Sequence, residues 1–147
     1  MWPFNKPAKK SLSAFQAAVK AGKLIDMQKK PYKKFNEFLQ YTSPTGMTPA
    51  AFNEFINIPR EKGHKHIQKA ARWAMLLMEA HKYFDTWHDD PGKDDTFDTM
   101  FDIEVARLSG FHRFKKIRIR IEHSATDDDN FSAIVFMLPD EDYPLPS

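Results

Sequence analysis

The chain has 147 residues, of which 41% are hydrophobic, 14% aromatic and 29% charged, and its formal net charge is +2. This length suits one compact domain with a substantial core, and so many aromatic residues exclude a wholly disordered chain. The absence of cysteine excludes disulfides, thiol catalysis and cysteine-ligated zinc, and no apolar run approaches the ~20 residues that a membrane-spanning helix needs.

The first part of the sequence predicts a basic arm followed by short helices. Residues 1–10 contain two prolines and no hydrophobic periodicity, so we expect a flexible arm there. One helix follows the arm and ends at Gly22, and a second carries Pro31 in its first turn. Residues 43–46, Ser-Pro-Thr-Gly, predict a turn. Thr48 then caps a third helix, because the proline that follows it suits the first helical position.

Two stretches in the middle of the chain predict longer helices. Residues 64–87 carry apolar side chains at alternating spacings of three and four, which indicates one broad buried face. The predicted members of that face are Ile67, Ala71, Ala74, Met78 and His81, flanked by Ala70, Trp73, Leu77 and Phe84. Residues 95–110 show a second stripe at helical spacing, which Gly110 ends. Its members are Phe97, Phe101, Val105 and Leu108.

The last part of the chain changes to the periodicity of strands. Residues 116–122 alternate charged and apolar side chains, as in a half-buried strand, and residues 131–138 are apolar on both faces. Two strands alone are marginally stable, so we expect an antiparallel hairpin covered by helices. The predicted fold class is therefore α+β, a mainly helical body of about five helices with a C-terminal antiparallel β-hairpin packed on it. One domain spans residues 11–138, and residues 139–147 form an acidic tail.

Charge is segregated along the chain despite the small net value. Residues 1–34 hold nine lysines against one acid, and residues 111–121 hold five basic residues and no acid. Residues 85–110 hold eight acids against two basic residues, and residues 122–147 hold seven acids and no basic residue. Either these blocks neutralise one another within the fold, or they form oppositely charged surfaces for different partners.

The basic blocks indicate contacts with a polyanion such as nucleic acid. The N-terminal block interleaves lysines with aromatic residues such as Phe15 and Tyr32, whose rings could stack on bases. In the strand of residues 116–122, alternation places the arginines on one face. The residues expected to bind a polyanion are Lys6, Lys9, Lys10, Lys115, Arg118 and Arg120.

The acidic blocks indicate a surface for a basic partner. The residues expected to form it are Asp94, Asp95, Asp98, Asp102, Asp127, Asp128 and Asp129. No glycine-rich phosphate loop and no recognisable nucleophile–base pair occurs in the sequence, so we favour a non-enzymatic binding or regulatory protein with charge-polarised surfaces. We expect its partner to be a protein, with nucleic acid as the alternative. The first residues lack the apolar stretch of a secretory signal, which indicates the cytoplasm.

One cluster near the end of the predicted long helix has the composition of a metal site. His81, Asp85 and His88 are spaced i, i+4 and i+7, so they share one helical face, and two imidazoles with a carboxylate suit a divalent metal. A metal-dependent hydrolase is therefore a third functional hypothesis. The alternative is that His81 belongs to the core and that the other two residues form an ordinary surface pair, in which case we expect no cofactor.

Overall fold

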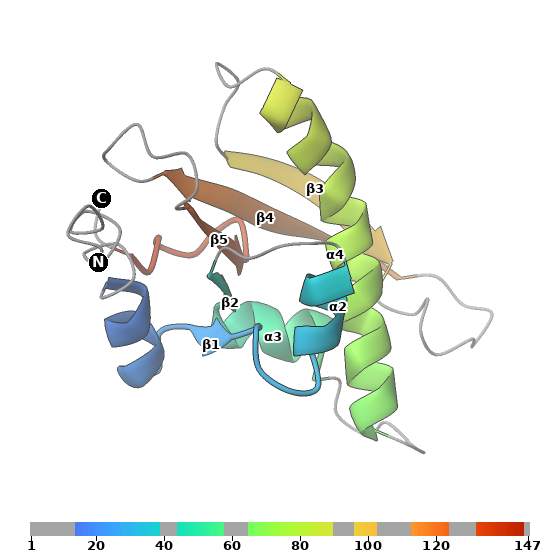
Figure 1. Cartoon of the computed structure of the whole chain (residues 1–147), viewed down its shortest axis with the longest axis horizontal. Coiled ribbons are helices and arrows are strands. Elements are labelled where there is room, and N and C mark those ends of the chain that lie inside the picture. Colours follow the sequence, from blue (N-terminus) through green and yellow to red (C-terminus); the bar gives the residue numbers. More distant parts are fainter. Residues whose placement is uncertain are drawn as a thin grey trace, which may run out of the picture.

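A five-stranded mixed sheet forms the centre of the molecule, in the order β1-β2-β5-β4-β3 (Figure 1). The computed structural model describes residues 14–38, 44–57, 65–89, 96–102, 113–123 and 132–145, with backbone alone at residues 38, 65–67, 83–89, 122, 123 and 132. The strands are β1 (Ile25–Asp26), β2 (Thr45–Met47), β3 (Thr96–Asp102), β4 (Phe114–His123) and β5 (Ser132–Met137). The helices are α2 (Lys33–Phe38), α3 (Pro49–Phe55) and α4 (Lys65–Asp89), and residues 14–20 are also helical.

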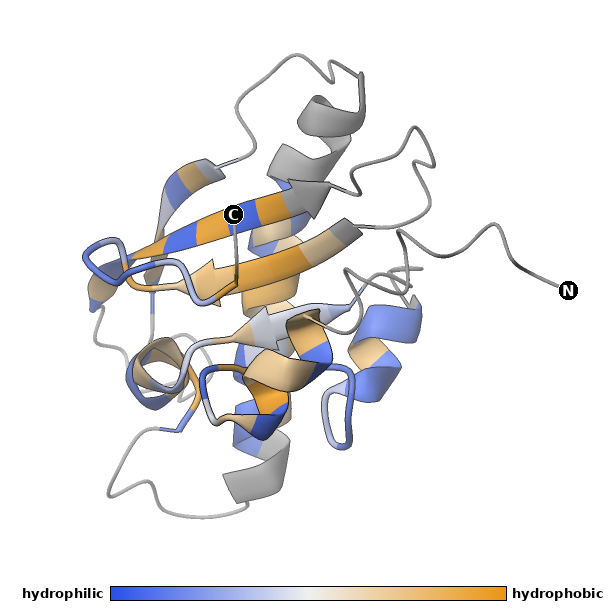
Figure 2. Ribbon diagram, turned by 90° about the vertical axis from the view of Figure 1, so that its left-hand side faces the viewer, coloured by the Kyte–Doolittle hydropathy of each residue, from blue (hydrophilic) through white to orange (hydrophobic). Residues whose placement is uncertain are grey.

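The strand pairings combine three antiparallel pairs of strands that are consecutive in the chain with one long-range parallel pair. β2 runs parallel to β5, whereas β1–β2, β3–β4 and β4–β5 are antiparallel. The antiparallel pairing of β4 with β5, in which Ile119 lies opposite Phe136, confirms the predicted hairpin. Figure 2 shows hydrophobic residues along β5 but alternating hydrophobic and hydrophilic residues along β4. This contrast is the one expected between a strand buried on both faces and a half-buried strand.

One face of the sheet packs against α2, α3 and α4 to form the main core (Figure 1). The ring of Trp73 on α4 meets that of Phe136 on β5 edge to face, with 5.0 Å between centroids. The indole Nε1 of Trp73 donates a hydrogen bond of 2.9 Å to the Oδ1 atom of Asn36 on α2. Because both groups are buried, this bond satisfies a donor that would otherwise be costly to desolvate. It also ties α2, and the lysine-rich turn before α2, to the long helix.

A smaller cluster covers the opposite face of the sheet near β2 and β5. Phe15 of the 14–20 helix packs there with Val135 of β5 and with Leu145 near the C-terminus. Gly46 of β2 makes the close approach of Phe15 possible, since a Cβ at Gly46 would lie only 2.9 Å from the Phe15 Cε2 atom. The 14–20 helix is therefore docked on the outer face of the sheet, well separated from α4 (Figure 1).

The prediction of a mainly helical body with a C-terminal hairpin is wrong. Five strands form a single mixed sheet that draws on almost the whole described chain, from β1 to β5. The class remains α+β, but the sheet, and not a helical bundle, is the scaffold on which the helices pack.

The largest local error concerns the helix predicted over residues 95–110. β3 occupies Thr96–Asp102 and pairs with β4 along its whole length. Phe97 and Phe101 fit a helical spacing of four, but together with Thr99 they also fit the alternation of a strand. In β3, Thr99 and Phe101 are buried and Phe97 is half-buried. Aromatic and β-branched residues favour strands, so the period of two outweighs the period of four here. Residues 103–110 lie outside the described part.

Two further expectations need correction. The predicted turn at residues 43–46 overlaps β2, because Thr45 and Gly46 pair with residues of β5 that are far away in sequence. The long helix exists as α4, but its buried face is centred on Trp73 and Leu77, and Met78, expected in the core, is 60% exposed.

Two of the predicted helix ends are confirmed, whereas Pro31, predicted in the first turn of its helix, precedes α2 by two residues. The Oγ1 atom of Thr48 accepts a hydrogen bond of 3.2 Å from the backbone N–H of Ala51, with proline at the start of α3. Gly22 follows the 14–20 helix with a φ of 79°, a left-handed conformation that glycine adopts without strain. In the part of the chain that the structure describes, no helix combines the length and the apolar character needed to cross a membrane.

Candidate polyanion-binding surface

Six exposed lysines lie on a continuous segment that runs from the end of the 14–20 helix to the first turn of α2. We call them the lysine surface: Lys20, Lys23, Lys29, Lys30, Lys33 and Lys34. None of these six lysines is among the residues predicted from the sequence to bind a polyanion, which in this block are Lys6, Lys9 and Lys10. The sequence feature that indicates the lysine surface is the excess of lysine over acid in residues 1–34.

The local backbone holds this segment in a compact turn. The carboxylate Oδ1 of Asp26 accepts a hydrogen bond of 2.9 Å from the backbone N–H of Gln28. The carbonyl of Lys29 then accepts from the backbone N–H groups of Tyr32, at 2.7 Å, and Lys33, at 3.0 Å. The ring of Tyr32 enters the core, where it meets Trp73 edge to face at 6.4 Å between centroids. With this ring as an anchor, the lysines on either side of it face solvent.

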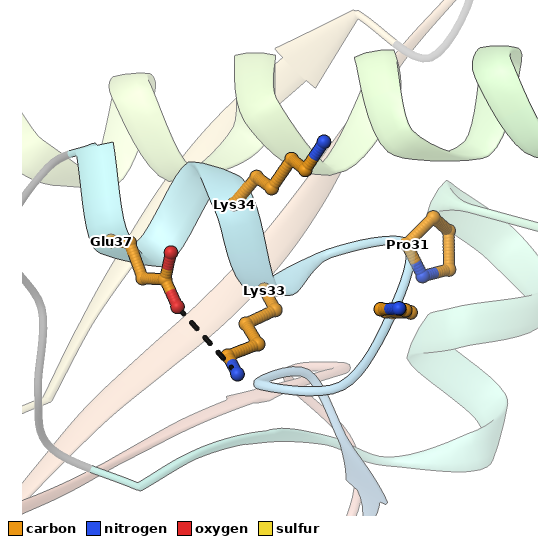
Figure 3. A pocket seen from close by; sticks show the side chains of 5 residues that line it. Pro31, Lys33, Lys34 and Glu37 are labelled. Carbon is orange, nitrogen blue, oxygen red and sulfur yellow. Dashed lines mark ion pairs between the residues drawn. The ribbon is translucent and has the colours of Figure 1, made fainter.

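Two open hollows, each with a volume of about 480 Å³, border the turn. One is lined by Lys30, Pro31, Lys33, Lys34 and Glu37 (Figure 3). The other is lined by Phe15, Gln16, Val19, Lys20, Asp26, Gln28, Lys29 and Pro44. Lys29 and Lys30 are consecutive in the chain, so the two hollows lie on either side of one dipeptide. Five of the six lysines therefore line one or the other of these two depressions.

The negative charges within residues 14–38 are too few to neutralise the lysine surface. Within residues 14–38, Asp26 and Glu37 are the two acids. Lys33 and Glu37 form an ion pair of 3.8 Å between two well-exposed side chains, which contributes ~0–1 kcal/mol. In the part of the chain that the structure describes, Lys33 is the one lysine of the six that forms an ion pair. The segment thus keeps a net positive charge.

The aromatic side chains of this segment do not extend the surface. Phe15 is 3% exposed and Tyr32 is 7% exposed, and both pack in hydrophobic clusters. The expectation that these rings are available to stack on bases is therefore wrong. Attraction to an anion at this surface depends on the ammonium groups.

The basic residues predicted on β4 are engaged within the fold. Arg118 forms two hydrogen bonds with the carboxylate of Asp98 on β3, of 2.8 and 3.1 Å. The guanidinium of Arg120 lies 3.9 Å above the ring of Tyr143, a cation–π contact. Lys115 forms an ion pair with Glu54 of α3. Lys6, Lys9 and Lys10 lie outside the described residues.

The bonds from Arg118 also affect the ionisation of its partner. They hold the pKa of Asp98 below its ordinary value of 3.8, against an opposing effect of desolvation. Asp98 and Arg118, predicted on surfaces for opposite partners, thus form one bidentate pair on the outer face of the sheet.

Most of the predicted acidic surface lies outside the described residues: Asp94, Asp95, Asp127, Asp128 and Asp129. Asp102, at the end of β3, accepts a hydrogen bond of 3.1 Å from the backbone N–H of Arg113. The two described members of the set, Asp98 and Asp102, therefore both make hydrogen bonds within the protein.

The predicted metal cluster is only partly visible. The backbone of α4 carries His81, Asp85 and His88 on one helix, and the side chain of His81 is half-buried. The side chains of Asp85 and His88 are outside the part of the chain that the structure describes. Among the side chains that are described, no group of three histidine, cysteine or acidic residues could hold a metal ion.

The chain was compared with protein-family models, with curated proteins and with solved structures, and none of the three comparisons found a match.

Proposed function

We propose that this protein is a binding protein that engages a polyanionic macromolecule through the lysine surface. The observation that carries the proposal is the placement of five exposed lysines around two hollows whose linings include the consecutive residues Lys29 and Lys30: Lys20, Lys29, Lys30, Lys33 and Lys34. A polyanion laid across these hollows replaces the counterions of several ammonium groups at once, which is the main source of affinity for highly charged chains.

The three basic residues that were predicted on β4 to bind a polyanion support this choice of surface. Arg118 is bonded to Asp98, Lys115 to Glu54, and Arg120 lies over Tyr143. A ligand that recruited these groups would have to displace an internal partner, at a cost that the lysine surface avoids. The acids that were predicted to attract a basic partner give no comparable exposed cluster within the described residues.

The experiment is a titration of the full chain with fluorescently labelled heparin, followed by anisotropy at low salt. The test variant is Lys29→Ala/Lys30→Ala, which removes one lysine from each hollow. The control variant is Lys82→Ala/Lys116→Ala, which removes the same charge from exposed positions on α4 and β4. Circular dichroism establishes that both variants are folded.

We expect the test variant to bind heparin about five- to thirtyfold more weakly, from a loss of about 0.5–1 kcal/mol per contact. The control variant should bind within about twofold of the unaltered chain, because its substituted lysines lie outside the surface. Equal weakening in both variants would show that net charge alone governs binding and would contradict the proposal. So would undiminished binding by the folded test variant.

A further inference from the structure

We infer that the polyanion is double-stranded DNA, held by its phosphate backbone without reading of base sequence. This inference rests on the proposed function, and it narrows the partner from polyanions in general to one class. Three properties of the lysine surface carry it: the kind of cation, the burial of the aromatic rings, and the directions in which the lysines project.

The cations of the surface are lysines alone. Lysine binds phosphate as a compact point charge, whereas arginine provides a planar fork that matches phosphates and carboxylates and also reads the edges of guanine. The four described arginines lie elsewhere in the fold: Arg72 in the core and Arg113, Arg118 and Arg120 in or beside β4. The surface is thus suited to phosphate contacts, which position a duplex but carry no sequence information.

Among the described side chains of residues 14–37, the burial of the aromatic rings argues against a single strand as the ligand. Proteins that bind single strands usually stack bases on aromatic side chains, and each stacked base adds ~1–3 kcal/mol. Phe15 and Tyr32 are buried, and Phe35 is half-buried against the main core. Phe114 is exposed, but it lies on β4, three strands away from β1 in the sheet order. A duplex keeps its bases stacked on one another and needs no such platform.

The directions of the lysines argue against a small phosphorylated ligand. Figure 3 shows Lys33 and Lys34 projecting from α2 toward different sides, so their ammonium groups do not converge on one point. Lys20 and Lys29 line the second hollow on the other side of the turn. Spread charges of this kind fit a regular array of phosphates, and duplex DNA carries one charge per ~1.7 Å of its axis.

Duplex RNA is the less suitable of the two duplexes. It is recognised largely by its shape and by contacts to its 2′-hydroxyl groups, which act both as donors and as acceptors. Lysine ammonium groups can donate a hydrogen bond to those hydroxyls but cannot accept one from them, so the lysine surface uses only part of what distinguishes RNA from DNA.

The experiment compares several probes on the full chain by fluorescence anisotropy. The probes are a labelled DNA duplex of about two helical turns, a second duplex of unrelated sequence, one strand of the first duplex, an RNA duplex of the same sequence, and polyglutamate of similar length. Each probe is titrated over a series of salt concentrations, with the unaltered chain, the Lys29→Ala/Lys30→Ala variant and the Lys82→Ala/Lys116→Ala control.

We expect the two DNA duplexes to bind within about twofold of each other and about threefold or more tighter than the other probes, with a dissociation constant of about 10⁻⁴–10⁻⁶ M at physiological salt. The slope of log K against log salt should fall in magnitude by about 1.8 in the test variant, because each lost phosphate contact contributes about 0.9. The control should keep the slope of the unaltered chain.

Several results would overturn the inference and leave the proposed function standing. Equal or tighter binding of the single strand, the RNA duplex or polyglutamate would do so, as would a tenfold preference for one DNA sequence. If heparin binding depends on Lys29 and Lys30 but duplex binding does not, the partner is another polyanion. If neither heparin nor any duplex loses affinity in the folded test variant, both proposals fail together.

Discussion

Gly46 shows how one small residue positions the N-terminal helix beside the lysine surface. A Cβ at this position would lie 2.9 Å from the Cε2 atom of Phe15, 3.1 Å from its Cζ atom and 3.4 Å from the Cδ1 atom of Leu24. We therefore expect Gly46→Ala to lower the free energy of unfolding by about 1–2 kcal/mol, since the clash outweighs the smaller entropy of the unfolded chain. Urea denaturation of the variant measures this change.

The control for this prediction is the same substitution made together with Phe15→Leu. Leucine lacks the ring atoms that approach Gly46 most closely, so the alanine should cost less in that background than in the unaltered chain. A cost that is the same in both backgrounds would show that contact with Phe15 is not the cause.

The Asp98–Arg118 pair makes a prediction about acid stability. The hydrogen bonds from Arg118 lower the pKa of Asp98 in the folded chain below its ordinary value of 3.8. The stabilisation is therefore fully present above pH 3.8 and is lost as the pH falls through the folded-state pKa. Because both side chains are partly exposed, Asp98→Asn should cost no more than about 1 kcal/mol at neutral pH.

The measurement is the free energy of unfolding of both proteins across this pH range. The difference between the unaltered chain and Asp98→Asn should shrink as the pH falls below 3.8, because the unaltered chain then loses the same interaction. A difference that stays constant into the acid range would contradict the assigned cause of the pKa shift.

Among the elements, β3 offers the sharpest test of the fold. In a strand, Thr99 faces the core and Met100 faces out, and Thr99 is indeed buried while Met100 is 51% exposed. Thr99→Asp should therefore lower the free energy of unfolding by about 2–4 kcal/mol, because it buries a charge without a partner. Met100→Asp should change it by less than about 1 kcal/mol. Thermal or urea denaturation of the two variants measures the contrast.

A helix over the same residues leads to a different result. Its apolar stripe would contain Phe97 and Phe101, which places Thr99 on the opposite, solvent-facing side. Met100 follows Phe97 by three residues, so in such a helix it lies beside the apolar stripe. A larger effect of Met100→Asp than of Thr99→Asp would therefore contradict the strand and support the helix that the spacing of four predicts.

The elements that could be predicted from the sequence are those with local signals. Thr48 caps α3 and Gly22 follows the 14–20 helix because caps depend on residues a few positions apart. β2 has only three residues, and its pairing with β5 brings together positions about 90 apart, which no local pattern records. The sequence predicts a helix in place of β3 because two phenylalanines four residues apart fit both the helical and the strand period. Only the pairing of β3 with β4 decides between the two.

At the scale of the whole molecule, the sequence shows where charges of one sign are concentrated, but it does not show which of these blocks remain exposed and which pair with each other. The lysines of residues 20–34 do remain together on the exterior, as a block of like charge indicates. The strand that carries Arg118 instead pairs with the strand that carries Asp98, so basic and acidic blocks meet across β3 and β4. Which blocks neutralise each other depends on strand order, and the sequence alone does not record strand order.

The central claim, that a polyanion binds at the lysine surface, is tested most directly by lysine footprinting. The unaltered full chain is acetylated briefly with and without saturating heparin, and the modified lysines are identified by mass spectrometry. We predict that Lys20, Lys23, Lys29, Lys30, Lys33 and Lys34 react severalfold more slowly with heparin bound, while the exposed Lys82 and Lys116 keep their rates. Protection of Lys82 and Lys116 with unchanged reactivity in residues 20–34 would contradict the claim.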